Sequence, residues 1–204
     1  MNIAVFASGR GSNFQAILDA IQKGFLPARV CAVVSNNSAA GALVTARTQN
    51  IPAFHLSQKQ FPSEDAFSKS LLSLLQDHDV QLIALAGYLK RLSPSVIERY
   101  RNKITNVHPA LLPSFGGPGM YGHHVHDAVI AAGVKVSGAT VHLVDEAYDR
   151  GPIVLQKAVE VLPNDDALSL AATVLRIEHE IYPLALKAFA ENRVEFKGNK
   201  VWIR

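Results

Sequence analysis

The stretch that decides the fold is Ile3-Ala4-Val5-Phe6-Ala7-Ser8-Gly9-Arg10-Gly11-Ser12-Asn13. It opens with a continuous apolar run, which is typical of a buried strand. A glycine loop follows, and apolar residues then recur at helical spacing, namely at Phe14, Ile17, Leu18 and Ile21. We therefore predict a strand, a glycine loop and an amphipathic helix, in this order.

The same alternation continues along the chain. Apolar runs predict strands over residues 30–34 and 80–86, with a short apolar stretch near Phe54, and helical spacing predicts helices over 41–49 and 64–76. Strands that are apolar on both faces and alternate with helices indicate a parallel sheet covered by helices on both faces. Ligands bind such sheets at the carboxyl ends of the strands, so functional residues should follow the strands.

The second half of the chain departs from this alternation. A predicted strand over residues 104–108 runs into Pro109 and a long, specialised loop over 113–122 that is rich in glycine and proline. The fold class is therefore α/β and Rossmann-like, with a mostly parallel central sheet flanked by helices on both faces and the last strands antiparallel. Beyond the loop we predict a helix near residues 126–132, strands over 136–144 and 153–161, a helix over 166–190 and a short β tail.

Composition and charge limit the class of protein. Hydrophobic residues make up 49% of the chain and charged residues 18%, which suits a single domain over residues 1–204, and there is no repeat or linker-like segment. The net charge is only +3, and the longest basic run is the pair Lys90-Arg91. Because no basic track exists for a phosphate backbone, we expect small-molecule substrates and no nucleic acid. A monomer and a homodimer both stay open.

The single cysteine and the first residues bear on the compartment. Cys31 lies in the apolar run 30–34, so it predicts a buried structural thiol in a reducing compartment and allows no intramolecular disulfide. The opening residues form no basic leader, and no stretch approaches the roughly 20 apolar residues of a membrane span. We expect a cytoplasmic protein without membrane contact.

The glycine loop places backbone amides at a helix N-terminus, where the helix dipole favours an anion. A dinucleotide-binding loop would have a third glycine where Phe14 stands and an acidic residue near Ser35-Asn36-Asn37, and a nucleoside-triphosphate loop would have a lysine. A monophosphate ester or a carboxylate is therefore favoured over NAD or ATP. The alternative is a tight turn in which Ser12 only caps the helix.

Three residues at or beyond the ends of predicted strands suit acyl transfer to an amine. Alternation sends Asn106 and His108 to the same face of their strand. A neutral amide can donate to a developing oxyanion, and an imidazole can move protons near neutral pH. Asp149 would stabilise the imidazolium and raise its pKa if it approached His108, although an aspartate before a glycine turn also commonly bonds its local backbone.

Two further groups of polar residues have weaker signals. His123, His124 and His126 cluster without a recognised metal spacing, so we expect histidines that are solvated or contact substrate, and no metal ligands. Glu178-His179 lies in the last predicted helix, where one of the two should face the core and need a partner such as a sugar hydroxyl.

The chain resembles the glycinamide ribonucleotide formyltransferases of the folate-dependent formyltransferase superfamily along nearly its whole length. The segments that carry the resemblance, in the family's order, are Ser8 to Asn13, Leu85-Ala86-Gly87-Tyr88, Asn106 to Pro113, Asp149-Arg150-Gly151-Pro152 and Glu178 to Pro183. The resemblance implies transfer of a formyl group from 10-formyltetrahydrofolate, as co-substrate, to the amine of phosphoribosylglycinamide. It implies neither a metal nor a nicotinamide cofactor.

The resemblance also implies roles for particular residues. Asn106 would hold the formyl oxygen, His108 would transfer the proton, and Asp149 would pair with His108 and help to position water. The ribose phosphate would be held by Gly11, Ser12 and Asn13, and the ribose hydroxyls by Glu178. The folate would lie against Leu89, Lys90, Arg91 and Leu92 and against the loop that contains Val144 and Asp145.

Two departures and three alternatives remain. Many relatives have a basic residue where Glu64 stands, near the folate glutamate tail, and the part of the loop from Gly116 to Gly122 is longer than in some members. A methionyl-tRNA formyltransferase would be expected to continue beyond Arg204 into a tRNA-binding module, and a formyltetrahydrofolate hydrolase to carry an N-terminal regulatory domain. A non-catalytic nucleotide- or folate-binding module is the alternative from a different class.

Overall fold

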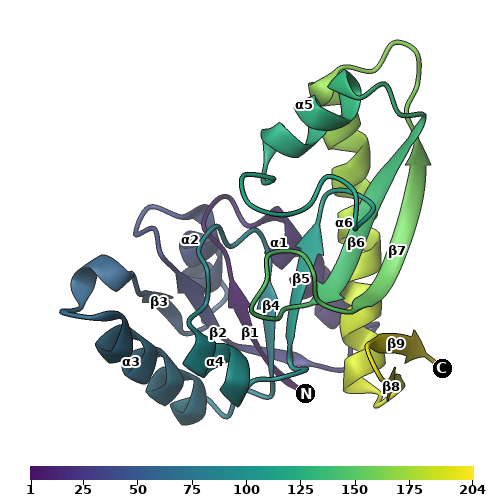
Figure 1. Ribbon diagram of the computed structural model, residues 1–204. Coiled ribbons are helices and arrows are strands. Elements are labelled where there is room, and N and C mark those ends of the chain that lie inside the picture. Colours follow the sequence, from purple (N-terminus) through teal and green to yellow (C-terminus); the bar gives the residue numbers. More distant parts are fainter. The chain divides into compact units, whose positions relative to one another are not determined.

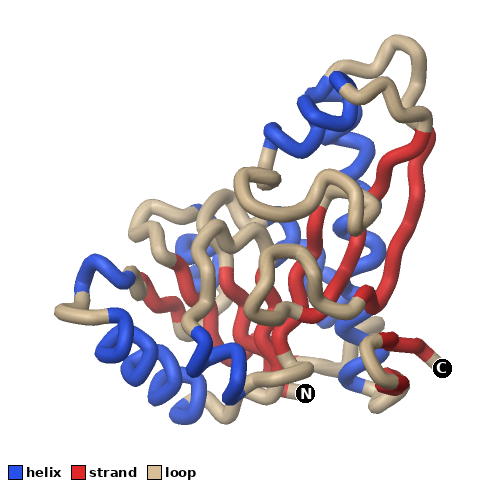
Figure 2. Tube along the Cα trace, viewed as in Figure 1, coloured by secondary structure: helices blue, strands red, loops and turns tan.

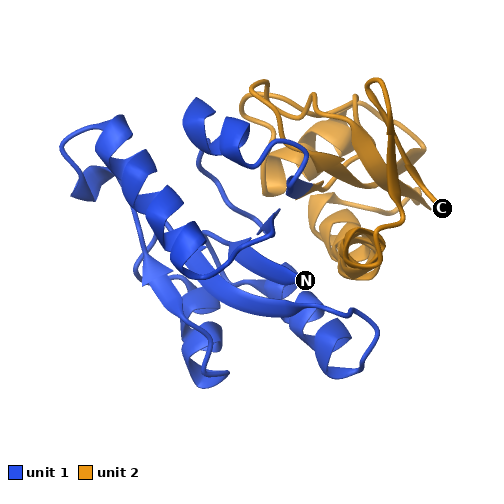
Figure 3. Ribbon diagram, turned by 90° about the horizontal axis from the view of Figure 1, so that it is seen from below, with its two compact units in different colours: residues 1–106 blue, residues 107–204 orange.

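The computed structural model describes residues 1–204, and they divide into two compact units, Met1–Asn106 and Val107–Arg204 (Figure 3). Helices, strands and long connecting loops are present in both units (Figure 2). The single domain expected from the sequence stays a prediction.

Unit 1 is a parallel sheet with helices on both faces. Its strands lie in the order β3-β2-β1-β4-β5, and each neighbouring pair is parallel. The helices α1 and α2 pack together on the far face in Figure 1, and α3 and α4 pack together on the near face. The strands are β1 (Asn2–Phe6), β2 (Arg29–Ser35), β3 (Ala53–His55), β4 (Leu82–Leu85) and β5 (Ile104–His108), and the helices are α1 (Ser12–Gln22), α2 (Gly41–Thr48), the 3-10 turn η1 (Gln58–Gln60), α3 (Glu64–Asp77) and α4 (Pro94–Arg99).

The core of unit 1 explains why the strands are apolar without interruption. Both faces of β1 and β4 are covered, so every residue of β4 and all but Asn2 of β1 are buried. The helices contribute fully buried side chains such as Phe14, Ile17 and Leu43. Burial of each such side chain stabilises the fold by about 1.5–3 kcal/mol. The predicted parallel sheet covered by helices is thereby confirmed.

Unit 2 contains the antiparallel strands. Residues of β6 (Val136–Leu143) pair antiparallel with β7 (Ile153–Glu160), as predicted for the last strands. The long helix α6 (Ala167–Ala190) packs against both strands and against α5 (His123–Ala131). Asp166 caps α6 by accepting hydrogen bonds from the amides of Leu168 and Ser169. The predicted β tail is the hairpin of β8 (Val194–Lys197) and β9 (Lys200–Ile203).

Two elements differ from the sequence-based expectation. The short helix α4 was not predicted, because it has only six residues, but Pro94 at its start and buried Val96 and Ile97 favour it. The helix α5 begins at His123, before the expected start at residue 126, because the turn ends at Gly122, whose φ of 57° stops any earlier helix. No helix, α6 included, combines the length and the apolar character that crossing a membrane requires.

Two glycines of unit 2 provide a matched test of the packing of β6. At Gly138, an added Cβ would collide with the carbonyl oxygen of Lys157 on β7 and lie 3.0 Å from the Cα of Ala158. At Gly133 (φ 64°) nothing lies within 4 Å, so the same change meets only backbone strain. We expect Gly138→Ala to lower the free energy of unfolding by about 3 kcal/mol or more, and Gly133→Ala by about 1 kcal/mol. Urea denaturation measures both, and equal losses would contradict the packing of β6 against β7.

Candidate active site

The strand β5 carries the first two candidate catalytic residues. Asn106 is half-buried and His108 is 3% exposed, and they lie two residues apart on one strand, so their side chains leave it on the same side. Pro109 follows at once and ends the strand. An amide and an imidazole thus leave the carboxyl end of a parallel strand together, as the sequence predicted.

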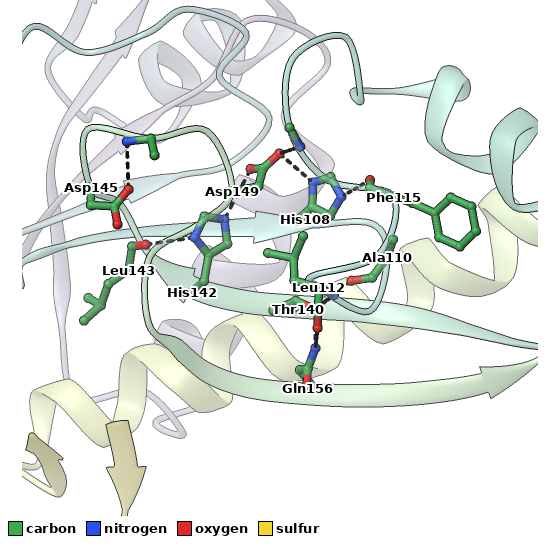
Figure 4. A network of polar contacts seen from close by, with 12 residues as sticks. His108, Ala110, Leu112, Phe115, Thr140, His142, Leu143, Asp145, Asp149 and Gln156 are labelled. Carbon is green, nitrogen blue, oxygen red and sulfur yellow. Dashed lines mark hydrogen bonds and ion pairs between the residues drawn. The ribbon is translucent and has the colours of Figure 1, made fainter. Parts of the chain in front are cut away.

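His108 is held by the Phe115 carbonyl, seven residues further along the chain, and by the distant Asp149 (Figure 4). Its Nε2 lies 2.8 Å from the carbonyl oxygen of Phe115, and its Nδ1 lies 3.7 Å from Oδ2 of Asp149. Because a carbonyl oxygen only accepts, Nε2 carries the hydrogen of the neutral ring, and Nδ1 is the atom left to accept a proton. The 3.7 Å gap to Asp149 exceeds a hydrogen bond and would shorten when Nδ1 is protonated.

Burial lowers the pKa of His108, and the nearby His142 acts in the same direction. The carboxylate of Asp149 and the carbonyl of Phe115 raise it, but the net pKa lies below the ordinary value. The sequence-based expectation that Asp149 approaches His108 is correct, and Asp149 does favour the imidazolium. Asp149 raises the pKa of His108 as expected, but desolvation of the ring outweighs the attraction of this one carboxylate.

Asp149 joins the loop over residues 113–122, hereafter the glycine-rich loop, to two histidines. Its Oδ2 accepts a hydrogen bond of 2.8 Å from the amide of Gly117, and its Oδ1 lies 3.5 Å from Nε2 of His142. Burial raises the pKa of Asp149, but the contact with His142, the Gly117 amide and the charges of the two histidines outweigh it, so the net pKa is lowered and the carboxylate is ionised. Asp149 bonds to a distant segment, in contrast to the local backbone role that was the alternative.

His142 is the residue that sequence reasoning missed. It is 2% exposed near the end of β6, and its Nδ1 donates a hydrogen bond of 2.8 Å to the carbonyl oxygen of Leu143. The other nitrogen, Nε2, lies 3.5 Å from Oδ1 of Asp149. Each histidine therefore has one nitrogen committed to a carbonyl and the other directed at Asp149. The sequence signal that could have identified His142 is its position as a titratable residue within the otherwise mostly apolar predicted strand over residues 136–144.

A second network fixes the chain just after His108 (Figure 4). The buried hydroxyl of Thr140 donates to the carbonyl oxygen of Ala110 at 2.6 Å and accepts from the amide of Leu112 at 3.0 Å. Gln156 donates from Nε2 to the carbonyl oxygen of Leu112 and to Thr140 Oγ1, both at 2.9 Å. The start of the glycine-rich loop is thereby tied to β6 and β7.

The loop itself packs closely on the carboxylate. A Cβ added at Gly116 would lie 3.1 Å from the Cβ of Asp149 and would collide with the side chain of Leu112. A side chain at position 116 would therefore require Leu112 and Asp149 to shift. The glycine-rich loop therefore covers Asp149 and His108 with its backbone, at Gly116, Gly117 and Phe115.

In unit 1 the predicted anion-binding loop has the expected form. Gly11 precedes α1 with φ 84°, and a Cβ there would lie 2.8 Å from the Cβ of Ala42. No side chain caps α1, and Ser12 is its first residue, so the alternative in which Ser12 caps the helix is wrong. Ser12 is half-buried and Asn13 is buried. The first turn of α1 is left with the amides that suit an anion.

Ser8 connects this loop to the segment expected to bind folate. The buried hydroxyl of Ser8 donates to Asn36 Oδ1 at 2.5 Å and accepts from the amide of Leu89 at 2.8 Å. The amide of Ser8 also donates to the carbonyl oxygen of Gly87 at 3.0 Å. The carboxyl ends of β1, β2 and β4 are thus held together by one residue.

The other predicted binding residues differ in exposure. Leu89, Lys90 and Arg91 are exposed, whereas Leu92 is 3% exposed and belongs to the core, so its side chain is not free to contact a ligand. In unit 2, Val144 and Asp145 are half-buried, and Asp145 accepts a hydrogen bond from the amide of Ala147 at 2.9 Å. Glu178 is buried in α6 and His179 is half-buried, which confirms that one of the pair faces the core.

Comparison with known proteins agrees with this arrangement. Residues 1–186 match the model of the formyl transferase family. The chain is 42% identical to the chloroplastic phosphoribosylglycinamide formyltransferase of Vigna unguiculata over 98% of its own length, and it spans only 64% of that protein.

Solved structures are similar along nearly the whole chain. Glycinamide ribonucleotide transformylase 1 from Symbiobacterium toebii has a TM-score of 0.93 and 40% identity, with 100% of this chain and 93% of that chain covered. A formyltetrahydrofolate deformylase from Pseudomonas syringae pv. tomato has a TM-score of 0.88 and 25% identity, with 99% of this chain and 65% of that chain covered.

The role of His142 can be tested by titration of Asp149. Replacement of His142 by leucine removes the first of the partners that lower the pKa of the carboxyl, so we expect this pKa to rise while Asp149 stays in place on the Gly117 amide. Carboxyl carbon NMR as a function of pH measures it. Val136→Ala is the control on the same strand, because Val136 is the first residue of β6 and is 53% exposed. An Asp149 titration that is the same in His142→Leu and in the unmodified protein would contradict this role.

Proposed function

The chain belongs to the formyl transferase family, and from this premise we propose that it transfers the formyl group of 10-formyltetrahydrofolate to the amine of 5'-phosphoribosylglycinamide. The products are 5'-phosphoribosyl-N-formylglycinamide and tetrahydrofolate, in de novo purine biosynthesis. The observation that carries the proposal is the pair of the buried His108 and the half-buried Asp149, with Asn106 two residues before His108 on β5, because it supplies the groups that acyl transfer to an amine needs. The names of the similar proteins supply the substrates.

The reaction is a direct attack of the amine on the formyl carbon. The new bond joins the amine nitrogen to this carbon, and the carbonyl electrons move to oxygen to give a tetrahedral oxyanion. The side-chain amide of Asn106 donates to that oxygen, and such a donor is worth most where charge develops. Collapse breaks the bond from carbon to the folate nitrogen, which leaves with a proton. No covalent enzyme intermediate and no metal take part.

His108 moves the proton between the two nitrogens. The lowered pKa keeps its ring neutral near neutral pH, so it can accept the proton of the attacking amine at Nδ1. The resulting imidazolium faces the ionised Asp149 and is stabilised by it until the proton passes to the leaving folate nitrogen. Burial makes His108 a weaker base, and Asp149 restores part of this basicity. Asp149 also positions water in the site.

The substrate-binding residues follow from the same proposal. The ribose phosphate binds at the start of α1 through Gly11, Ser12 and Asn13, where the helix dipole favours an anion, and Glu178 binds the ribose hydroxyls. The folate lies against Leu89, Lys90 and Arg91, the backbone of Leu92, and the segment of Val144 and Asp145. We further propose that the protein acts in the cytoplasm on small molecules alone, as a monomer or homodimer.

A formyltetrahydrofolate hydrolase is the second candidate, favoured by the similarity to the Pseudomonas deformylase. The two activities differ in the nucleophile, which is the amine in one and water in the other. The first experiment is therefore to follow the absorbance change as 10-formyltetrahydrofolate, or its stable dideaza analogue, loses its formyl group with and without phosphoribosylglycinamide. Loss that requires the amine supports the transferase, and equal loss without it refutes it.

Two variants test the site in the same assay. We expect Asn106→Ala to lower kcat by about 10²–10³-fold with a modest change in KM, because the amide acts mainly on the oxyanion. Asp149→Asn should also lower kcat while the protein stays folded, as checked by circular dichroism. Arg204→Ala, in the exposed tail, is the control that should keep full activity. Unchanged turnover in both site variants would refute the mechanism.

The pH dependence of kcat/KM reports the pKa of His108. Because this pKa is lowered and the neutral ring is the active form, the rate should rise with pH and level off below about pH 6.5, the ordinary pKa of histidine. Asp149→Asn removes a group that raises this pKa, so the rising limb should move to lower pH. His142→Leu removes a group that lowers it, so the limb should move to higher pH. Shifts in the same direction would contradict the assignment.

A further inference from the structure

The exposed side of α5 brings together three side chains that bind metal ions well. The donor atoms of His123, His124 and Asp127 all lie within 4.8 Å of one another, and all three residues are exposed. From the sequence we expected no metal ligands here, because the two histidines are adjacent and no known spacing was present. The structure supplies a third ligand, because α5 begins at His123 and Asp127 lies one helical turn further along, next to both rings.

We propose that His123, His124 and Asp127 form a binding site for a divalent late first-row metal ion such as Zn²⁺, and that the bound ion restrains the glycine-rich loop over residues 113–122. Two imidazoles and one carboxylate are a ligand set that favours zinc, nickel or copper over magnesium or calcium. Three protein ligands leave one position of a tetrahedral ion for water. The ion takes no part in formyl transfer.

The geometry requires only a small adjustment. Ligand atoms at the usual distances from a tetrahedral zinc ion lie about 3.3 Å apart, against the 4.8 Å spread found here. The three side chains are exposed, so rotation about their own bonds can close the gap without disturbing the core. The backbone beneath them is fixed, because Val125, His126 and Val129 on the other side of α5 are buried and α5 packs on α6.

One feature of α5 disfavours binding of a cation at this site, and two features favour it. The positive end of the α5 dipole disfavours a cation at this first turn, and the Asp127 carboxylate compensates for it. The rings of His123 and His124 already lie 4.0 Å apart between centroids, so both nitrogens reach one ion without moving the helix.

The site lies where the glycine-rich loop joins α5. Tyr121 of the loop packs edge-on against His124, with the ring centroids 5.4 Å apart. The same loop supplies the Phe115 carbonyl that contacts His108 and the Gly117 amide that contacts Asp149. An ion that fixes His124 therefore fixes one end of the loop, while the Thr140 network fixes its other end.

The test is Zn²⁺ titration of the full chain by isothermal calorimetry, without an affinity tag that would bind the ion itself. We expect one equivalent to bind, and His123→Ala, His124→Ala and Asp127→Asn each to weaken binding at least about tenfold, as loss of a ligand should. His55→Ala in β3 is the matched control and should bind as the unmodified protein does. Undiminished affinity in His123→Ala and Asp127→Asn, or weak binding of several equivalents, would overturn the site.

Two further measurements do not depend on enzymatic activity. Co²⁺ in place of Zn²⁺ should give the visible absorption of a tetrahedral ion, and it should be lost in Asp127→Asn. Amide hydrogen exchange over residues 113–122 should slow when Zn²⁺ is added to the unmodified protein and stay unchanged in His124→Ala. Loop exchange that is insensitive to Zn²⁺ while the ion binds would refute the restraint of the loop.

Discussion

The carboxylate of Asp149 is the group around which unit 2 is organised. Placing an ionised carboxyl where its side chain is only 12% exposed is costly unless hydrogen-bond donors surround it. The carboxylate accepts a hydrogen bond from the Gly117 amide, and it lies 3.7 Å from His108 at the end of β5 and 3.5 Å from His142 near the end of β6. A charge that must be satisfied in this way fixes the glycine-rich loop and the two strand ends around it.

The two histidines share this carboxylate but are not equivalent. Each gives one nitrogen to a backbone carbonyl, so each presents the other nitrogen to Asp149. His108 follows Asn106 on β5, which makes it the ring beside the proposed oxyanion donor. His142 lies on β6 and stabilises the ionised state of Asp149. The proposed proton transfer by His108 therefore also depends on His142, which does not itself move the proton.

Backbone and small residues do much of the positioning in both units. In unit 1, Ser8 joins the carboxyl ends of three strands by hydrogen bonds, and Gly11 allows the loop to approach Ala42. In unit 2, Gly116 lets the loop pass over Asp149. These contacts use main-chain groups or a single hydroxyl, which explains why the residues that shape the site are not the ones that carry its chemistry.

The sequence by itself determined the alternation of strands and helices, the parallel sheet, and the candidates Asn106, His108 and Asp149, because periodicity, strand ends and residue chemistry are local properties. It also placed one residue of the pair Glu178-His179 in the core. It missed α4, the true start of α5, and His142. Because the start of α5 was missed, the meeting of His123, His124 and Asp127 within one helical turn was missed with it. Only the tertiary structure decided the partners of Asp149 and the net lowering of the pKa of His108. These depend on burial and on distances between segments far apart in the chain, and no local pattern of residues encodes either.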